Sequence, residues 1–221
     1  MREQAAQTER LLQSGWRLHD EPSKGAPDHG AKRSREIVPA MIASMSREDI
    51  GIGPAEPPAS ASETDLSMMR HALLAAKDAA ERGEVPVGAV VARGREILAV
   101  AANEREATGD PTAHAELLAI RGASSTLGGW RLAGCTLYAT LEPCPMCAGA
   151  AHAARLSRLV YAAPDPKAGY AGTLHNTPAD DRLNHTLAVD GGVLEAEAAR
   201  MLRDFFKNRR IRPRKAPENA S

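Results

Sequence analysis

Two short segments of the sequence carry residues whose types and spacing could bind a metal and do hydrolytic chemistry. Residues 111–116 include His114 and Glu116, and residues 141–147 include Cys144 and Cys147. One imidazole and two thiolates suit a zinc site with three protein ligands and a fourth position open to water. An open position is typical of catalytic zinc, since structural sites usually have four protein ligands. We therefore predict that His114, Cys144 and Cys147 bind the metal.

Both segments are predicted to lie where a helix begins. Pro145 suits the first position of a helix, which makes Cys144 the expected N-cap residue and places Cys147 one turn on, on the same side. The partial positive charge of a helix N-terminus favours a thiolate over a thiol. His114 and Glu116 are only two residues apart, and in the middle of a helix such a pair would point in different directions. Both can reach one metal if they lie in the first turn and the metal lies beyond the end of the helix.

The apolar pattern predicts a chain of alternating helices and strands. We expect helices over residues 65–82, 113–123, 144–155 and 193–210, with Asp65 capping the first and Gly83 ending it. We expect strands over 85–92, 96–102, 135–141, 159–163 and 187–189. Loops are expected between residue 102 and residue 112 and over 164–184. This alternation predicts a layered α/β domain.

Composition excludes several classes of protein. Lys+Arg and Asp+Glu both number 28 in 221 residues, and this zero net charge argues against general coating of nucleic acid. Three cysteines do not suit a disulfide scaffold. No stretch has the length of a membrane helix and the N-terminus lacks a signal pattern, so we expect a cytoplasmic protein that does not bind membranes.

The combination of His-x-Glu with Pro-Cys-x-x-Cys is the known signature of zinc deaminases. Residues 66–210 further resemble bacterial tRNA-specific adenosine deaminases, and the resembling pieces are residues 84–90, Asn103, 110–116, 136–150, 165–169, 184–185 and 204–210. The resemblance implies a three-layer α/β/α cytidine-deaminase-like fold, with a central mixed sheet of about five strands flanked by helices.

This resemblance also implies an activity, which is hydrolysis of the wobble adenosine of a tRNA anticodon to inosine. It implies one Zn²⁺ per subunit that activates water, with Glu116 shuttling protons off the metal. It implies a homodimer and a tRNA anticodon stem-loop as partner. The residues it assigns to substrate binding are Asn103, Val85, Pro86, Asp165, Lys167 and Phe206. Basic residues between Arg203 and Lys215 could bind phosphates, or could simply form a solvated helix end.

The resemblance does not cover the whole chain. Residues 1–62 contain six prolines among Ser, Ala, Gly and charged residues, and such a segment buries too little apolar surface to offset its ordering entropy. We predict a disordered arm or a mis-called start over 1–62, a zinc deaminase domain over 63–212 and a basic flexible tail over 213–221. Pro164 and Pro166 flank Asp165, which departs from the family pattern and could re-aim that loop.

Three other functions share parts of this pattern. A small-molecule deaminase acting on guanine, cytidine or a related nucleobase or nucleoside would have the same metal motifs, although it would not need a basic final helix. A non-catalytic RNA-binding protein on this fold is disfavoured because Glu116 and all three ligands are present. A Cys-x-x-Cys pair alone is also typical of redox proteins, but the upstream His-x-Glu favours metal.

Overall fold

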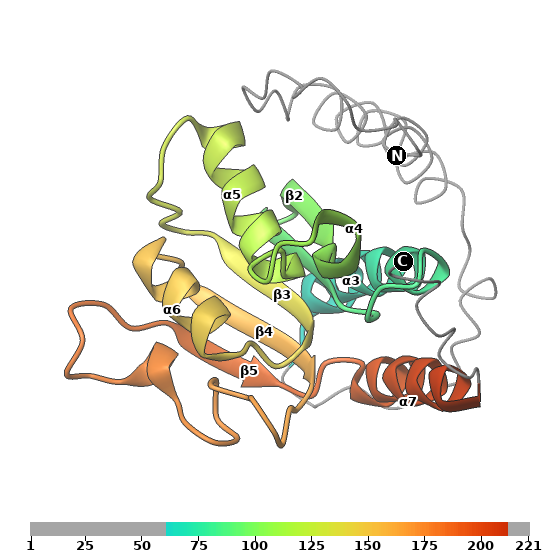
Figure 1. Cartoon of the computed structure of the whole chain (residues 1–221). Coiled ribbons are helices and arrows are strands. Elements are labelled where there is room, and N and C mark those ends of the chain that lie inside the picture. Colours follow the sequence, from blue (N-terminus) through green and yellow to red (C-terminus); the bar gives the residue numbers. More distant parts are fainter. Residues whose placement is uncertain (1–60, 212–221) are drawn as a thin grey trace, which may run out of the picture.

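The computed structural model describes the backbone of residues 61–211 and the side chains of residues 61–209, so residues 1–60 of the predicted arm and the whole predicted tail lie outside the described residues. A five-stranded sheet forms the middle of this region, with helices on both faces (Figure 1). Its strands are β1 (Gly88–Arg93), β2 (Glu96–Ala102), β3 (Thr136–Leu141), β4 (Arg158–Ala163) and β5 (Ala188–Gly191). The predicted mixed sheet and three-layer α/β/α architecture are confirmed.

The strand order is β2-β1-β3-β4-β5, and the sheet has an antiparallel part at the β2 end and a parallel part at the β5 end. β1 is antiparallel to β2 and to β3, whereas β3, β4 and β5 run parallel. The helices are α3 (Glu63–Glu81), α4 (Arg105–Thr108), α5 (Ala115–Leu127), α6 (Pro145–Ala153) and α7 (Glu195–Ile211), with a 3-10 turn, η2, at Thr177–Ala179. Among residues 61–211, no helix is long and apolar enough to cross a membrane.

The core consists of two apolar layers, one on each face of the sheet. Leu137 and Leu159 face one layer with residues of α5 and α6, whereas Tyr138 and Val160 face the other with residues of α3 and α7. Successive strand residues point to opposite faces, so each parallel strand contributes to both layers. This double coverage explains why β3 and β4 are apolar along most of their length.

The cap of the first helix was predicted wrongly. Ser62, rather than Asp65, is the N-cap residue of α3, and Asp65 completes a capping box by accepting from the Ser62 N–H at 3.0 Å. Asp65 also accepts from the Tyr138 hydroxyl at 3.0 Å and from Arg158 Nη1 at 2.6 Å. Burial opposes ionisation, but the bonds from Arg158 and Ser62 outweigh it and lower the pKa of Asp65 to about 2.

Other differences from prediction lie mainly at element boundaries. The strand predicted from residue 85 begins at Gly88, because the Val87 N–H turns back to the Val85 carbonyl at 2.8 Å. The helix predicted over 113–123 runs from Ala115 to Leu127. The helices predicted over 144–155 and 193–210 and the strand predicted over 187–189 are displaced by one or two residues at their ends. The predicted loops contain α4 and η2.

Candidate active site

The start of α5 positions His114 and Glu116. His114 is the N-cap residue with extended backbone, so it precedes the first turn, and Glu116 is the second residue of the helix. The Leu118 N–H donates to the His114 carbonyl at 3.0 Å, and the His114 N–H donates to the Thr112 carbonyl at 2.7 Å. The two side chains therefore leave the chain close to the positive end of α5 despite their two-residue spacing.

The start of α6 positions the two cysteines. Cys144 is the N-cap residue and Pro145 is the first helical residue, as the sequence predicts. Cys147 is fully buried, and the Cys144 carbonyl accepts the Ala148 N–H at 2.9 Å. Both sulfurs thus lie within the first turn of a helix that follows directly from the end of β3.

The three predicted ligands converge on one point. The Nδ1 atom of His114 lies 3.7 Å from the Cys144 Sγ and 3.6 Å from the Cys147 Sγ. The ligand atoms all lie within 4.8 Å of one another. Tetrahedral bonds of about 2.0 Å to nitrogen and about 2.3 Å to sulfur would separate these atoms by roughly 3.5 Å. The residues therefore fit zinc, and the soft thiolates favour it over harder divalent ions.

The proton affinities of the ligands differ. The pKa of Cys144 is lowered to about 4, first by the hydrogen bond from the Cys147 thiol and then by the one from His114. The pKa of Cys147 is raised by its bond to Cys144 and by burial. The pKa of His114 is raised by its bond to Cys144. Cys144 therefore loses its proton easily, whereas zinc must displace the proton of Cys147, so the binding of zinc releases protons.

Glu116 lies inside the site and not on its rim. It is 4% exposed, and burial raises its pKa, whereas the neighbouring His114 and Cys147 partly oppose this effect. The carboxyl group is therefore next to the ligands and inaccessible to bulk solvent. Burial therefore makes this carboxylate a better proton acceptor than an exposed one, placed to exchange a proton with a neighbouring group.

Comparison with known proteins agrees with this geometry. Residues 62–163 match the cytidine and deoxycytidylate deaminase zinc-binding region. A tRNA-specific adenosine deaminase of Bacillus subtilis is 49% identical over 157 residues, which are 71% of this chain and 98% of that protein. The chain belongs to the tRNA-specific adenosine deaminase family. It is a zinc-dependent hydrolase with His114, Cys144 and Cys147 as its zinc-binding residues.

Two further known proteins are similar to this deaminase. A solved structure from work on A-to-I editing by tRNA:A34 deaminases at the wobble position of transfer RNA has a TM-score of 0.59 and 42% identity, and the match covers 62% of this chain and 99% of that one. A tRNA(Ile)-lysidine synthase of Deinococcus radiodurans is 44% identical over 192 residues. That match covers 86% of this chain, but the chain spans only 31% of the synthase.

The residues predicted to contact the base are connected through the main chain to the segment that carries a metal ligand of the deaminase. Asn103 follows β2, and its N–H donates to the Val87 carbonyl at 2.9 Å, which joins it to the turn containing Val85 and Pro86. The next residue along, Glu104, donates its N–H to the carbonyl of Ala113, directly before His114, at 3.0 Å. The main chain thus brings these three predicted contacts to the segment that carries the histidine ligand.

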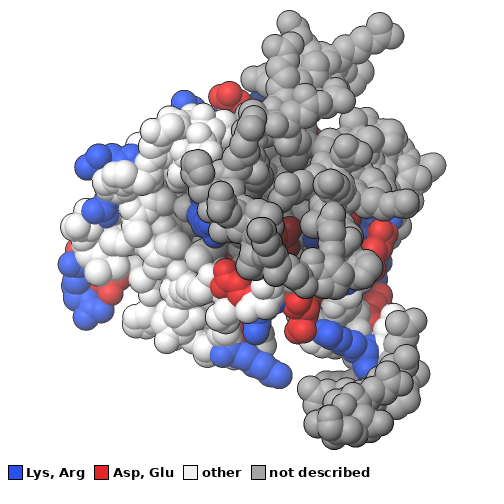
Figure 2. Space-filling view, turned by 45° about the horizontal axis from the view of Figure 1, so that its top comes forward, with Lys and Arg blue, Asp and Glu red and all other residues white. Residues whose placement is uncertain are grey.

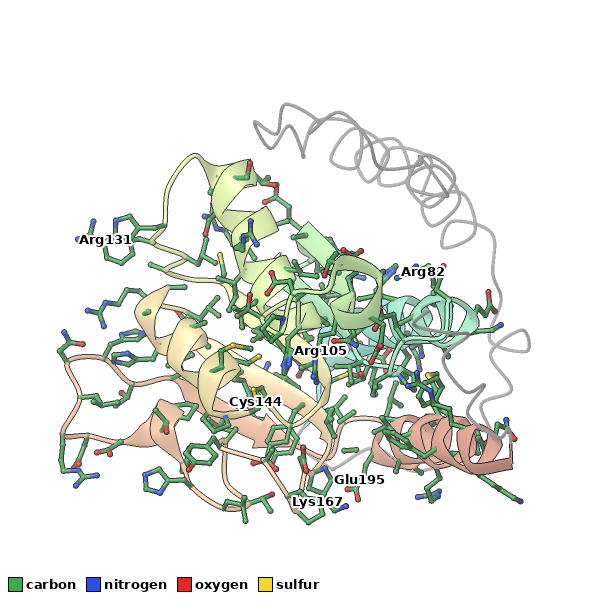
Figure 3. All side chains as sticks on the ribbon, in the orientation of Figure 1. Arg82, Arg105, Arg131, Cys144, Lys167 and Glu195 are labelled. Atoms are coloured by element: carbon green, nitrogen blue, oxygen red, sulfur yellow. The ribbon has the colours of Figure 1, made fainter. Side chains whose placement is uncertain are left out.

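The predicted contacts in the loop after β4 are placed differently. The Asp165 Oδ1 atom accepts the N–H groups of Lys167 at 2.9 Å and Ala168 at 3.1 Å, so this carboxylate shapes its own loop. Lys167 is exposed. In Figure 3, the labelled Arg105 and Lys167 lie on opposite sides of Cys144. The positive charge of Arg105 also lowers the pKa of His114, although this effect is a minor one. Arg105 of α4 therefore lies near the rim of the site, whereas the role of the exposed Lys167 stays a prediction.

Phe206 lies in the second half of α7, the helix whose first half packs on the same face of the sheet as α3 (Figure 1). It is 44% exposed and packs edge-on against Phe205, with ring centroids 5.4 Å apart. On the uncovered part of the face in Figure 2, basic and acidic side chains are interspersed and form no broad basic field. The predicted basic residues beyond Arg209 lie outside the described side chains.

Two buried glutamates near the site were missed by sequence reasoning. Glu84 and Glu142 are each 1% exposed and accept several hydrogen bonds from segments that lead to the site. Each stands within a motif that the sequence singled out, next to Val85 or Pro143. A carboxylate directly beside buried apolar residues was the available signal, because such a group is rarely buried unless it is paired.

Proposed function

We propose that this deaminase hydrolyses the wobble adenosine of a tRNA anticodon to inosine and releases ammonia. The observation that carries the proposal is the buried Glu116 carboxyl group, two residues beyond the ligand His114 and in contact with Cys147. The named relatives support tRNA as the substrate and adenosine as the base. The reaction adds one water and loses one ammonia, so protons must move from the water to the ring and to the departing amine.

The side chains of the site divide this work between them. His114, Cys144 and Cys147 would hold the zinc, which when bound would supply a water of lowered pKa. Glu116 would take one proton from that water and pass it to the ring nitrogen next to C6. It would then take the second proton from the new C6 hydroxyl and pass it to the amine as the C6–N bond breaks. Burial supports this role, because it raises the pKa of Glu116 above its ordinary value and so makes the carboxylate a better proton acceptor.

Substrate binding would use both sides of the site. Asn103, Val85 and Pro86 would contact the splayed adenine, and a single-stranded anticodon loop makes such splaying inexpensive. Asp165, Lys167 and Phe206 would lie near the anticodon loop. Exposed basic residues of α7, namely Arg203, Lys207 and Arg209, add positive charge for phosphates. A tRNA substrate also supports a cytoplasmic location.

We also propose a homodimer, as the family resemblance implies. Light scattering would then give a mass of twice the 23.5 kDa chain. A mass of one chain at micromolar concentration would contradict this assembly.

The activity is tested with an arginine-type anticodon stem-loop that carries adenosine at the wobble position. Inosine is measured by mass spectrometry, and free guanine, cytidine and adenosine serve as parallel substrates. Glu116→Ala should slow the reaction about 10²- to 10⁴-fold, whereas Glu106→Ala, at an exposed glutamate of α4, should change it little. Ammonia from a free base with no inosine in the RNA would overturn the substrate assignment.

A further inference from the structure

Glu84 connects the end of α3 with the part of the site that faces the base. Its Oε2 atom accepts a hydrogen bond from Nδ2 of Asn103 at 3.0 Å, and its Oε1 atom accepts the N–H of Ala107 at 2.7 Å. The Glu84 N–H in turn donates to the Ala79 carbonyl at 2.9 Å. Glu84 is only 1% exposed, and its carboxylate and backbone together are held by three segments: the end of α3, the residue after β2, and α4.

We infer that Glu84 is a positioning residue for this reaction. It holds the side-chain amide of Asn103 in one orientation, in which the Oδ1 atom of Asn103 faces the base. The inference rests on the proposed function, because that function assigns Asn103 to the base. It differs from a general packing role, since it concerns which end of one amide group faces the substrate.

The chemistry of the carboxylate decides the orientation of the amide. An ionised carboxylate can only accept hydrogen bonds, so the atom of Asn103 that faces it must be the donating nitrogen. A flipped amide would place Oδ1 against Oε2, two acceptors without a proton between them. Asn103 is 5% exposed, so water could not readily replace the lost bond. Glu84 thereby selects one of two amide orientations that are nearly equal in shape.

The orientation leaves one acceptor available. Among the described residues, no donor is paired with Oδ1 of Asn103. This oxygen is also not one of the buried polar atoms without a partner, so it is accessible. The backbone of the next residue pairs with Ala113, directly before His114, so the amide lies on a segment fixed to the metal ligand. An acceptor at this place can receive a hydrogen from a bound nucleotide.

Glu84 also completes the short helix that follows Asn103. The N-cap residue of α4, Glu104, makes no side-chain cap, although the first N–H groups of a helix need partners. Glu84 supplies the missing acceptor to Ala107, the third residue of α4, from 23 residues earlier in the chain. A single carboxylate therefore holds both the amide and the helix that carries the rim residue Arg105.

A double-mutant cycle separates the two effects. In Glu84→Gln, the glutamine oxygen can keep the Ala107 N–H, but its amino group then faces the amino group of Asn103. We expect kcat/KM for the stem-loop to fall about 10- to 100-fold. In an Asn103→Ala background, the same change should cost less than about threefold, because the amide through which Glu84 acts is gone. Glu81→Gln, at an exposed residue that ends α3, is the matched control.

Two results would overturn the inference. Glu84→Gln could leave kcat/KM unchanged, or it could cost the same factor with and without Asn103, which would mean that Glu84 only supports α4. A rescue variant covers the case in which Glu84→Gln is poorly folded. Combining Glu84→Gln with Asn103→Asp lets the glutamine donate to a carboxylate, and it should be at least about tenfold more active than Glu84→Gln alone. No recovery would refute the orientation argument.

A measurement on the free protein separates this inference from the proposed function. In ¹⁵N spectra, the side-chain amide of Asn103, assigned by its loss in Asn103→Ala, should show a proton protected from exchange, and Glu84→Gln should remove that protection. Wild-type protein that edits no RNA would refute the function while leaving this result intact. An unprotected amide in active enzyme would refute the inference alone.

Discussion

Replacing Glu142 with Gln tests how the loop after β4 is held beside the metal ligands. The Glu142 carboxylate accepts the N–H groups of Asp165 at 3.0 Å, Ala171 at 3.0 Å and Thr173 at 2.9 Å, together with the Thr173 hydroxyl. A methyl group on Gly169 would overlap this carboxylate. The loop is therefore wrapped closely around one buried charge, which directly precedes the Pro-Cys of the zinc site.

The size of the effect follows from the geometry of these bonds. In Glu142→Gln, the side chain would have one acceptor oxygen, which can keep the Ala171 and Thr173 N–H groups that Oε1 now receives. The amino group would then face the Asp165 N–H, donor against donor. An unpaired buried donor costs about 1–3 kcal/mol. We expect a loss of about 2 kcal/mol, which lowers the Tm of a domain of this size by about 4–8 °C.

The pH dependence supplies a second observable. Burial opposes ionisation of Glu142, but the bonds from Thr173, Asp165 and Ala171 outweigh it and lower its pKa. A lowered folded-state pKa gives stability that is present above the unfolded-state value of about 4.3 and is lost as the pH falls below it. Glu142→Gln should therefore differ most from wild type near neutral pH and approach it in acid.

Thermal unfolding, hydrogen exchange and kcat/KM would be measured together. We expect faster exchange of the amides of residues 165–173 and a lower Tm, with full zinc occupancy. Asp181→Asn removes an exposed carboxylate from the same long connection and should leave all of these values unchanged. A Tm within about 1 °C of wild type, with unaltered exchange in the loop, would refute the claim that this carboxylate holds it.

Three further predictions concern the fold and the metal. Asp65 has a pKa of about 2, so it adds stability above about pH 4 that is lost as the pH falls towards 2. In urea unfolding at several pH values, Asp65→Asn should therefore lose less stability in acid than wild type does. A pH profile parallel to that of wild type would contradict this prediction. A methyl group at Gly88 would overlap the Ala72 carbonyl, so Gly88→Ala should cost about 1–3 kcal/mol in urea unfolding, whereas Gly129→Ala, in open space, should cost less than about 0.5. Cys144→Ser should lower the zinc per chain measured by mass spectrometry and abolish activity, and undiminished zinc would exclude this ligand.

The metal centre could be predicted from sequence because its signals are local. Pro145 at the first helical position identifies Cys144 as the cap, and neither assignment depends on distant residues. Asp65 was predicted to be the cap, although Ser62 and Asp65 together match the Ser-x-x-acidic pattern of a capping box, which is a local signal. Asp65 also bonds Tyr138 and Arg158, which are 73 and 93 residues away. No local pattern contains those partners.

The surroundings of the metal were harder to predict from the sequence, because they too depend on residues that are far apart in the chain. A four-residue helix such as α4 has too few residues for an apolar period, and its cap, Glu84, comes from 23 residues earlier. The predicted contacts Asn103, Lys167 and Phe206 came from resemblance, and their roles stay predictions. Distances between loops decide such contacts, and a single sequence contains no measure of them.

The two glutamates closest to the zinc ligands show where residue type stops being informative. Glu116 and Glu142 are both buried and both stand within two residues of a ligand. Burial dominates at Glu116 and raises its pKa, whereas hydrogen bonds dominate at Glu142 and lower its pKa. Burial and hydrogen bonding thus shift two neighbouring carboxyl groups in opposite directions, which the residue type alone does not reveal. This contrast supports the prediction, made from the His-x-Glu motif, that Glu116 rather than Glu142 transfers protons.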